Sequence, residues 1–180
     1  MTDLTIPDAS PGTATVRLAA AGDERAFARL VSEHHPSMAR VAYAITGNAD
    51  TAADAVQSAW TIAWRRLGAL RDHGSIRAWL IAIAANEARQ QIRRAGTRGV
   101  LDLTVTDFPG PGDPADRIAT LDLARVLRGL SRDDRTLLAL RYAAGLDSGE
   151  IAAHLGGSAS GVRSRLSRLV ERLRLELDHA

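Results

Sequence analysis

The chain has 180 residues, of which 46% are apolar, 4% aromatic and 24% charged, and its formal net charge is +2. The absence of cysteine excludes disulfides, thiolate metal sites and thiol nucleophiles. No uninterrupted apolar run approaches the roughly 18 residues of a membrane span, and the polar start MTDLTIPDASPG lacks the apolar core of a signal peptide. We therefore expect no membrane insertion and a cytoplasmic location.

The apolar residues are mostly Ala, Leu, Val and Ile, a mixture that favours helices. All 23 basic residues are arginine, and they are unevenly spread. Residues 77–98 carry five Arg against one Glu, as do residues 158–175, whereas residues 101–122 carry five Asp against one Arg. This pattern predicts two basic helical segments separated by an acidic connector.

Apolar spacing and helix-breaking residues predict four helices in the first half of the chain. Residues 1–12 are polar and aperiodic, so we expect them to be disordered. Pro36 suits the first turn of a helix, and Asp50 and Ser75 are the expected N-caps of the two helices that follow. The predicted helices cover residues 13–34, with a break near Gly22, then 36–45, 50–70 and 75–94.

Residues 96–116 are rich in Pro, Gly and Asp, which is typical of a flexible linker. Helices then resume, with Ser131 as one expected cap. They are predicted over residues 117–130, 132–144, 148–155 and 158–177. The predicted fold is all-α: a helical domain over residues 13–95, the acidic linker over 96–116, and a second small helical domain over 117–180 that ends in a helix-turn-helix.

A polar stripe runs along the predicted third helix. Its members are spaced by four, three and four residues, so they share one side of the helix: Asp50, Asp54, Gln57 and Thr61. The expected buried side holds Ala53, Val56, Trp60, Trp64 and Leu67. No histidine or nucleophile falls in the stripe, which indicates a protein-docking surface or simple solvent exposure rather than acid–base catalysis.

The predicted fourth helix aligns Asn86, Arg89 and Arg93 at steps of three and four residues. Arginine suits phosphates, and asparagine suits base edges. The strip is therefore either a nucleic-acid contact or an exposed face that keeps the protein soluble.

The last two helices flank the turn Gly156-Gly157. The final helix has an apolar line composed of Val162, Leu166, Leu169 and Leu173. The candidate DNA contacts on its other sides and at its start are Ser158, Ser160, Arg163, Ser164, Arg165, Ser167 and Arg168. A dry back and a Ser/Arg front favour insertion into the DNA major groove, the alternative being an ordinary amphipathic helix with a solvated face. Gly149 and Gly161 should weaken the first turns of these two helices.

The five histidines show no ligand spacing with a carboxylate partner, and no phosphate loop or catalytic set is present. We therefore expect no metal, no cofactor and no enzymatic activity.

Taken together, these segments resemble the extracytoplasmic-function (ECF) group of bacterial sigma factors. The family's region 2 resembles GDERAFARLV…VAYAITGNADTAADAVQSAWTIAWRRL…GSIRAWLIAIAANEARQQIRR. Its region 4 resembles LARVLRGLSRDDRTLLALRYAAGLDSGEIAAHLGGSASGVRSRLSRLVERLR.

The resemblance implies a promoter-specificity subunit that binds core RNA polymerase through the stripe containing Asp54 and Gln57. Asp72 and His73, in the loop before the fourth helix, and the strip from Asn86 to Arg93 would contact the melted minus-ten element. The last helix would read the minus-thirty-five element of promoter DNA, and an anti-sigma factor is an expected partner. The alternative is a stand-alone helix-turn-helix regulator, which would need a sensor or dimerisation domain in place of the N-terminal helices.

Overall fold

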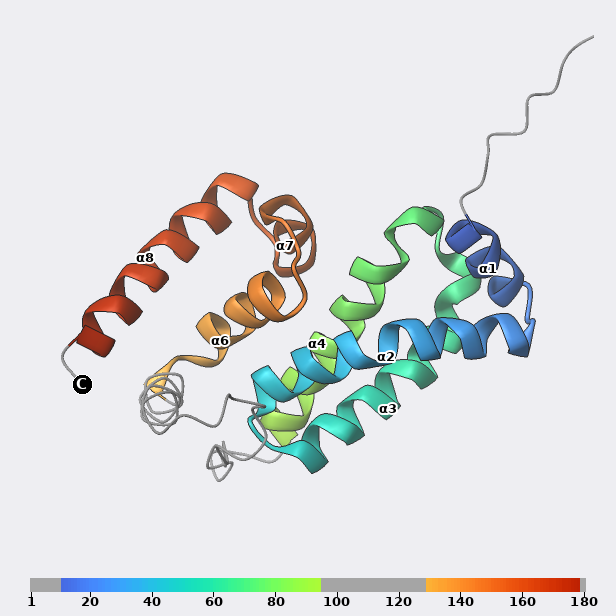
Figure 1. The fold of residues 1–180 in the computed structure, drawn as a ribbon, viewed down its shortest axis with the longest axis horizontal. Coiled ribbons are helices and arrows are strands. Elements are labelled where there is room, and N and C mark those ends of the chain that lie inside the picture. Colours follow the sequence, from blue (N-terminus) through green and yellow to red (C-terminus); the bar gives the residue numbers. More distant parts are fainter. Residues whose placement is uncertain (1–10, 95–128, 179–180) are drawn as a thin grey trace, which may run out of the picture.

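The computed structural model describes residues 11–94 and 129–178, and every regular element in these two ranges is helical. The N-terminal bundle, residues 11–94, contains α1 (Pro11–Ala20), α2 (Glu24–Thr46), α3 (Ala49–Arg66) and α4 (Ile76–Arg94). The C-terminal body, residues 129–178, contains α6 (Arg132–Leu138), α7 (Ser148–Leu155) and α8 (Ala159–Asp178) (Figure 1). The predicted all-α fold with two helical bodies is confirmed for these residues. The predicted disorder of residues 1–10, the linker over 96–116 and most of the helix over 117–130 lie outside them.

One long helix, α2, replaces the two helices predicted on either side of Pro36. Proline inside a helix costs about 3 kcal/mol because it removes one hydrogen bond and crowds the preceding turn. Apolar residues before and after Pro36 bury the same face of α2, among them Leu30, Met38 and Ile45. Burial of that continuous face outweighs the local cost, so the prediction of a new helix at Pro36 was wrong. Gly47, with φ of 67°, ends the helix and donates its N–H to the Tyr43 carbonyl.

Both predicted caps in this bundle need correction. Asn48, not Asp50, caps α3, because its side-chain oxygen accepts the Thr51 N–H at 2.8 Å. Ser75 lies in a short 3₁₀ turn (His73–Ser75), where its hydroxyl donates to the Asp72 carbonyl at 2.8 Å. A side chain placed this way organises the turn and does not accept an N–H of α4.

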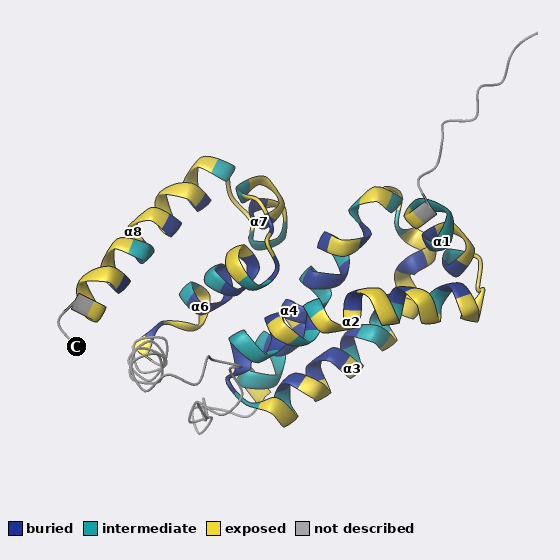
Figure 2. Ribbon diagram, in the orientation of Figure 1, coloured by how far each residue is buried: buried dark blue, intermediate teal, exposed yellow. Residues whose placement is uncertain are grey.

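The core of the N-terminal bundle lies where α2, α3 and α4 face one another, as the dark blue positions of Figure 2 show. The side of α3 that enters this core is lined by small residues: Ala52, Ala55, Val56, Ala59 and Ala63. Small side chains let neighbouring helices approach closely. Ala53 and Trp64, predicted to be buried, are exposed, because the buried line runs through the alanines and leaves Trp64 at the edge of the bundle.

The C-terminal body follows the sequence prediction closely. Ser131 caps α6 by accepting the Asp134 N–H at 3.1 Å, and a π-helical turn (Ala139–Ala143) extends this helix. The four predicted apolar positions of α8 are buried: Val162, Leu166, Leu169 and Leu173. They pack beside Leu137, Leu140 and Ile151. The body therefore has its own small core, and α6 with its π-helical turn also packs against α2 of the bundle.

Candidate polymerase and DNA surfaces

The polar stripe of α3 lies on the outside of the bundle. All four of its predicted members are exposed: Asp50, Asp54, Gln57 and Thr61. The Thr61 hydroxyl donates to the Gln57 carbonyl at 3.1 Å, one turn back in the same helix. Since that is the one hydrogen bond found for the stripe's side chains within the described residues, the two carboxylates are available to an outside partner.

An apolar groove of about 630 Å³ lies directly beside this stripe, between α2 and α3. Gln57 and Thr61 form part of its wall, together with Val31, Tyr43 and Trp60. An apolar groove edged by carboxylates and amides has the composition of a surface that receives another protein.

An aromatic cluster fixes one end of the groove. The Trp60 indole N–H donates to Nδ1 of His35 at 3.2 Å, which holds α3 to α2. Phe27 meets the rings of Trp60 and Trp64 edge-on, with centroids 5.6 and 4.7 Å apart. Sequence spacing did not reveal the groove, because it depends on how α2 and α3 sit together.

The loop before α4 is organised by Asp72. Its Oδ1 accepts the Gly74 N–H at 3.0 Å, and its backbone carbonyl accepts the Ser75 hydroxyl. Asp72 is exposed and His73 is half-buried. The predicted minus-ten contacts at this loop are therefore accessible, although the Asp72 carboxylate already holds the turn.

The strip on α4 is also accessible, with Asn86 and Arg93 exposed and Arg89 half-buried. Arg89 donates from Nη2 to Oδ1 of Asn86, which joins two members of the strip. At 1.5 Å of rise per residue, Asn86 and Arg93 lie about 15 and 25 Å along the helix from its start at Ile76. The loop and the strip are thus separate contact points along α4 and do not form one pocket.

The turn between α7 and α8 requires its two glycines, since Gly156 and Gly157 have φ values of 79° and 111°. Asp147 and Glu150 form a capping box that fixes the start of α7: Asp147 accepts the Glu150 N–H, and the Glu150 carboxylate accepts the Asp147 N–H, both at 2.8 Å. The second helix begins with a similar cap, because Oγ of Ser158 accepts the Gly161 N–H at 3.1 Å. A helix-turn-helix with both starts fixed holds α8 rigidly against α7.

The outer face of α8 carries the predicted DNA contacts. All seven are exposed: Ser158, Ser160, Arg163, Ser164, Arg165, Ser167 and Arg168. Four of them line one open hollow of about 420 Å³: Arg163, Ser164, Ser167 and Arg168. Arg165 is directed elsewhere, towards α6, where its guanidinium binds Asp134. The structure therefore gathers the serines, Arg163 and Arg168 on one face and separates Arg165 from them.

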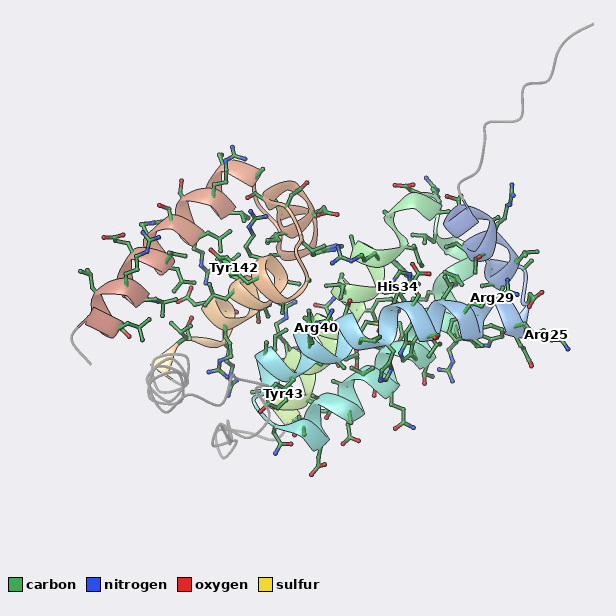
Figure 3. All side chains as sticks on the ribbon, in the orientation of Figure 1. Arg25, Arg29, His34, Arg40, Tyr43 and Tyr142 are labelled. Carbon is green, nitrogen blue, oxygen red and sulfur yellow. The ribbon has the colours of Figure 1, made fainter. Side chains whose placement is uncertain are left out.

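A second groove of about 420 Å³ adjoins this face, and sequence reasoning missed it. Arg141 and Tyr142 contribute to it from the end of α6, beside Arg163 and Ser167 of α8. Tyr142 is 66% exposed, and Figure 3 shows where it lies in the C-terminal body. An exposed tyrosine followed by Gly145 in the sequence indicated a turn, but nothing in the spacing placed it next to α8.

No metal centre is formed by the residues of 11–94 and 129–178, which bring together no group of three His, Asp or Glu side chains suited to an ion. Within the same ranges, no helix is long and apolar enough to cross a membrane.

Two protein-family patterns match the chain, one over each body. Sigma-70 region 2 matches residues 30–98, and Sigma-70 region 4 matches residues 120–173. A region 2 match in the N-terminal bundle removes the alternative of a stand-alone regulator with a sensor or dimerisation domain there.

Similar proteins agree with these matches. The ECF RNA polymerase sigma factor SigL of Mycobacterium tuberculosis is 33% identical over 169 residues, which cover 91% of this chain and 96% of SigL. The chain also spans 42% of a longer relative from Xanthomonas campestris, at 32% identity over 169 residues.

Two solved structures share the fold. CnrH in complex with the cytosolic domain of CnrY has a TM-score of 0.71 and 27% identity, with 93% of this chain and 97% of that chain covered. The sigma factor RpoE in complex with the anti-sigma factor NepR, from Bartonella quintana, has a TM-score of 0.68 and 26% identity, with 84% and 96% covered. The chain therefore belongs to the sigma-70 family as an ECF-type RNA polymerase sigma factor, a non-enzymatic protein whose regions 2 and 4 serve promoter recognition.

Proposed function

We propose that the exposed face of α3 is the surface by which this sigma factor docks on core RNA polymerase. The observation that carries the proposal is the position of Asp54 and Gln57 on the rim of the apolar groove between α2 and α3. A helical segment of the polymerase would place apolar side chains in the groove and basic side chains against Asp50 and Asp54. Apolar burial would supply most of the affinity, and the carboxylates would set the orientation.

Promoter contacts are assigned to both bodies. Asp72 and His73 at the start of α4, and Asn86, Arg89 and Arg93 further along it, are proposed to follow the melted minus-ten strand. Their separation along α4 suits an extended single strand of several nucleotides. Arginines hold the backbone of such a strand, and Asn86 offers both a donor and an acceptor to an unstacked base.

The outer face of α8 is proposed to enter the major groove at the minus-thirty-five element. Arg168 and Arg163 are the candidates for guanine edges or phosphates, and Ser160, Ser164 and Ser167 leave room for close approach. Ser158 contributes indirectly, because its hydroxyl caps α8. Arg165 would have to exchange the Asp134 carboxylate for a phosphate before it contacted DNA.

An anti-sigma factor is the proposed regulatory partner, since RpoE, a structural relative, is complexed with one. Because the polymerase and the promoter lie in the cytoplasm, the protein is proposed to act there.

Polymerase binding by an Asp54→Arg variant tests the docking surface. The reversed charge would face the basic side chains of the polymerase, so we expect the variant to lose binding to core polymerase and promoter-specific transcription in vitro. Asp133→Arg is a matched control, because Asp133 is an exposed carboxylate on α6. Normal polymerase binding by Asp54→Arg would show that the docking surface lies elsewhere.

A further inference from the structure

The C-terminal body is attached to the bundle by a buried arginine. Arg135 of α6 is only 9% exposed, and its Nη1 donates to the Ile45 carbonyl of α2 at 3.2 Å. Its Nη2 donates to the Leu130 carbonyl in its own body, also at 3.2 Å. Ile45 lies in the last turn of α2, where carbonyls lack an intrahelical partner and the helix dipole is negative. A guanidinium is therefore well matched to this helix end.

A second arginine makes the same kind of contact in the opposite direction. Arg77, in the first turn of α4, donates from Nη2 to the Ala144 carbonyl. Ala144 caps the C-terminal end of the π-helical turn that extends α6. Each body thus supplies one arginine to the C-terminal end of a helix in the other body.

Histidine 154 of α7 adds a third contact across the same boundary, a hydrogen bond between its ring and the backbone of Ala78. Neither Arg77 nor Arg135 has an ion pair with a carboxylate among the described residues. The boundary is therefore held by charge-assisted hydrogen bonds to carbonyls, which water can replace when the bodies separate.

Separation is required by the geometry of a promoter. Elements at minus-ten and minus-thirty-five lie about 25 base pairs apart, or roughly 85 Å at 3.4 Å per base pair. The longest helices of the two bodies, α2 and α8, measure about 35 and 30 Å at 1.5 Å per residue. Two bodies of this size cannot reach both elements while they remain in contact. The chain between them, residues 95–128, could span at most about 110 Å when extended, so opening is sterically possible.

We propose that the free sigma factor rests in a closed state in which Arg77 and Arg135 latch region 4 onto region 2, and that the polymerase must open this latch. The inference rests on the proposed assignment of the two promoter elements to the two bodies. Closure leaves the face of α3 and the outer face of α8 exposed. The latch therefore does not hide either surface; it prevents both bodies from working on one promoter at once.

Energy transfer between two dyes tests the closed state in the full chain. The chain has no native cysteine, so Ala28→Cys on α2 and Ala153→Cys on α7 supply two exposed attachment sites, one in each body. We expect high transfer in the free protein and low transfer when core polymerase is bound. Low transfer in the free protein, equal to that of the complex, would overturn the proposal.

Arg77→Glu tests the latch itself, because Arg77 is exposed and its replacement leaves no cavity. A carboxylate facing the Ala144 carbonyl should repel the helix end, lower the transfer of the free protein, and raise its affinity for polymerase roughly three- to tenfold by removing the cost of opening. Arg77→Lys should give an intermediate value, since an ammonium retains the charge. The helix content of each variant, from circular dichroism, verifies that it has folded.

Arg29→Glu is the matched control. Arg29 is exposed on α2, and Figure 3 shows it at the end of that helix remote from α6 and α7. Its transfer should equal that of the unmodified chain. If Arg77→Glu also leaves transfer unchanged, the latch is disproved. If Arg77→Glu lowers transfer but no variant binds polymerase, the latch stands and the docking surface proposed on α3 fails.

Discussion

Asp134 on α6 holds Arg165 on α8 through two hydrogen bonds to one carboxylate oxygen, 3.2 Å from Nε and 2.9 Å from Nη2. Its other oxygen accepts a hydrogen bond from Arg172 at 3.0 Å. Burial alone raises the pKa of Asp134, but the hydrogen bonds from Arg165 and Arg172 outweigh it, and the pKa lies below its usual value. Two arginines of the DNA-binding helix are thus turned towards α6 by a single carboxylate.

Asp134→Asn should release both arginines. Each guanidinium that then contacts a phosphate adds about 0.9 to the slope of log affinity against log salt concentration. We expect tighter binding to random duplex DNA at low salt, with a slope steeper by up to about 1.8, and a smaller ratio of specific to non-specific affinity. Binding titrations at several salt concentrations measure both quantities.

Asp133→Asn is the control for this change, since it removes the same charge from a neighbouring exposed position. An equal change in slope for both variants would mean that the net charge, and not the release of Arg165 and Arg172, is responsible.

The position of Arg165 illustrates what the sequence could not reveal. Helical periodicity correctly predicted the buried line of α8, because spacing within one helix determines which residues share a face. It grouped Arg165 with the DNA contacts, although Asp134, its partner, lies 31 residues away in the chain. A contact of that kind depends on how two helices pack.

The same reasoning applies to the larger errors. Pro36 and Asp50 are typical of helix starts, but burial on both sides of Pro36 and the Asn48 cap decide the helix limits. The helix-turn-helix and the polar face of α3 depend on local spacing, and both were predicted. The groove beside Trp60 and the contacts of Arg77 depend on distant segments and had no sequence signal.

Arg168→Ala measures whether this residue reads a base. Arg168 is exposed on the outer face of α8, and its Nε donates to the Ser164 carbonyl at 3.3 Å. Loss of a base-edge contact should weaken binding to minus-thirty-five DNA by about 1–3 kcal/mol and relax specificity at one base pair. Equal weakening on random DNA would assign Arg168 to a phosphate. Arg174→Ala, near the end of the same helix, should affect both DNAs only slightly.

His34 should make folding sensitive to pH. Burial lowers the pKa of His34 from its ordinary 6.5, nearby Arg77 lowers it further, and Glu33 partly opposes both. The unfolded chain therefore takes up a proton at a pH where the folded chain does not, so stability falls as pH drops through about 6.5. Burial lowers the pKa of His154 in the same way.

Thermal unfolding between pH 7.5 and 5.5 checks this prediction. The melting temperature should fall towards pH 5.5, by up to about 1.4 kcal/mol of stability per pH unit for each group. His34→Gln should flatten this dependence, whatever its effect on stability at pH 7.5. A pH dependence identical to that of the unmodified chain would exclude His34 as the cause.

Gly149 and Gly161 offer a matched pair in the helix-turn-helix. Neither has a positive φ, so the backbone of both accepts alanine. A Cβ at Gly161 would lie 3.3 Å from the Ser158 hydroxyl, and a Cβ at Gly149 would lie 3.1 Å from Oδ1 of Asp147. The hydroxyl of Ser158 can move by a few tenths of an ångström. The Asp147 carboxylate is fixed by the capping box with Glu150 and cannot.

Gly161→Ala should therefore stabilise the protein by roughly 0.5–1 kcal/mol, since alanine loses less conformational entropy in a helix than glycine. Gly149→Ala should gain nothing or lose stability, because the added methyl group pushes on the oxygen that accepts the Gly149 N–H at 2.7 Å and the Glu150 N–H. Urea unfolding of the two variants and the parent chain measures the difference. If both substitutions stabilise equally, the capping box at Asp147 is looser than its hydrogen bonds indicate. If Gly161→Ala destabilises as much as Gly149→Ala, the Ser158 cap is the more rigid of the two, and the start of α8 is held more tightly than a single hydroxyl cap explains.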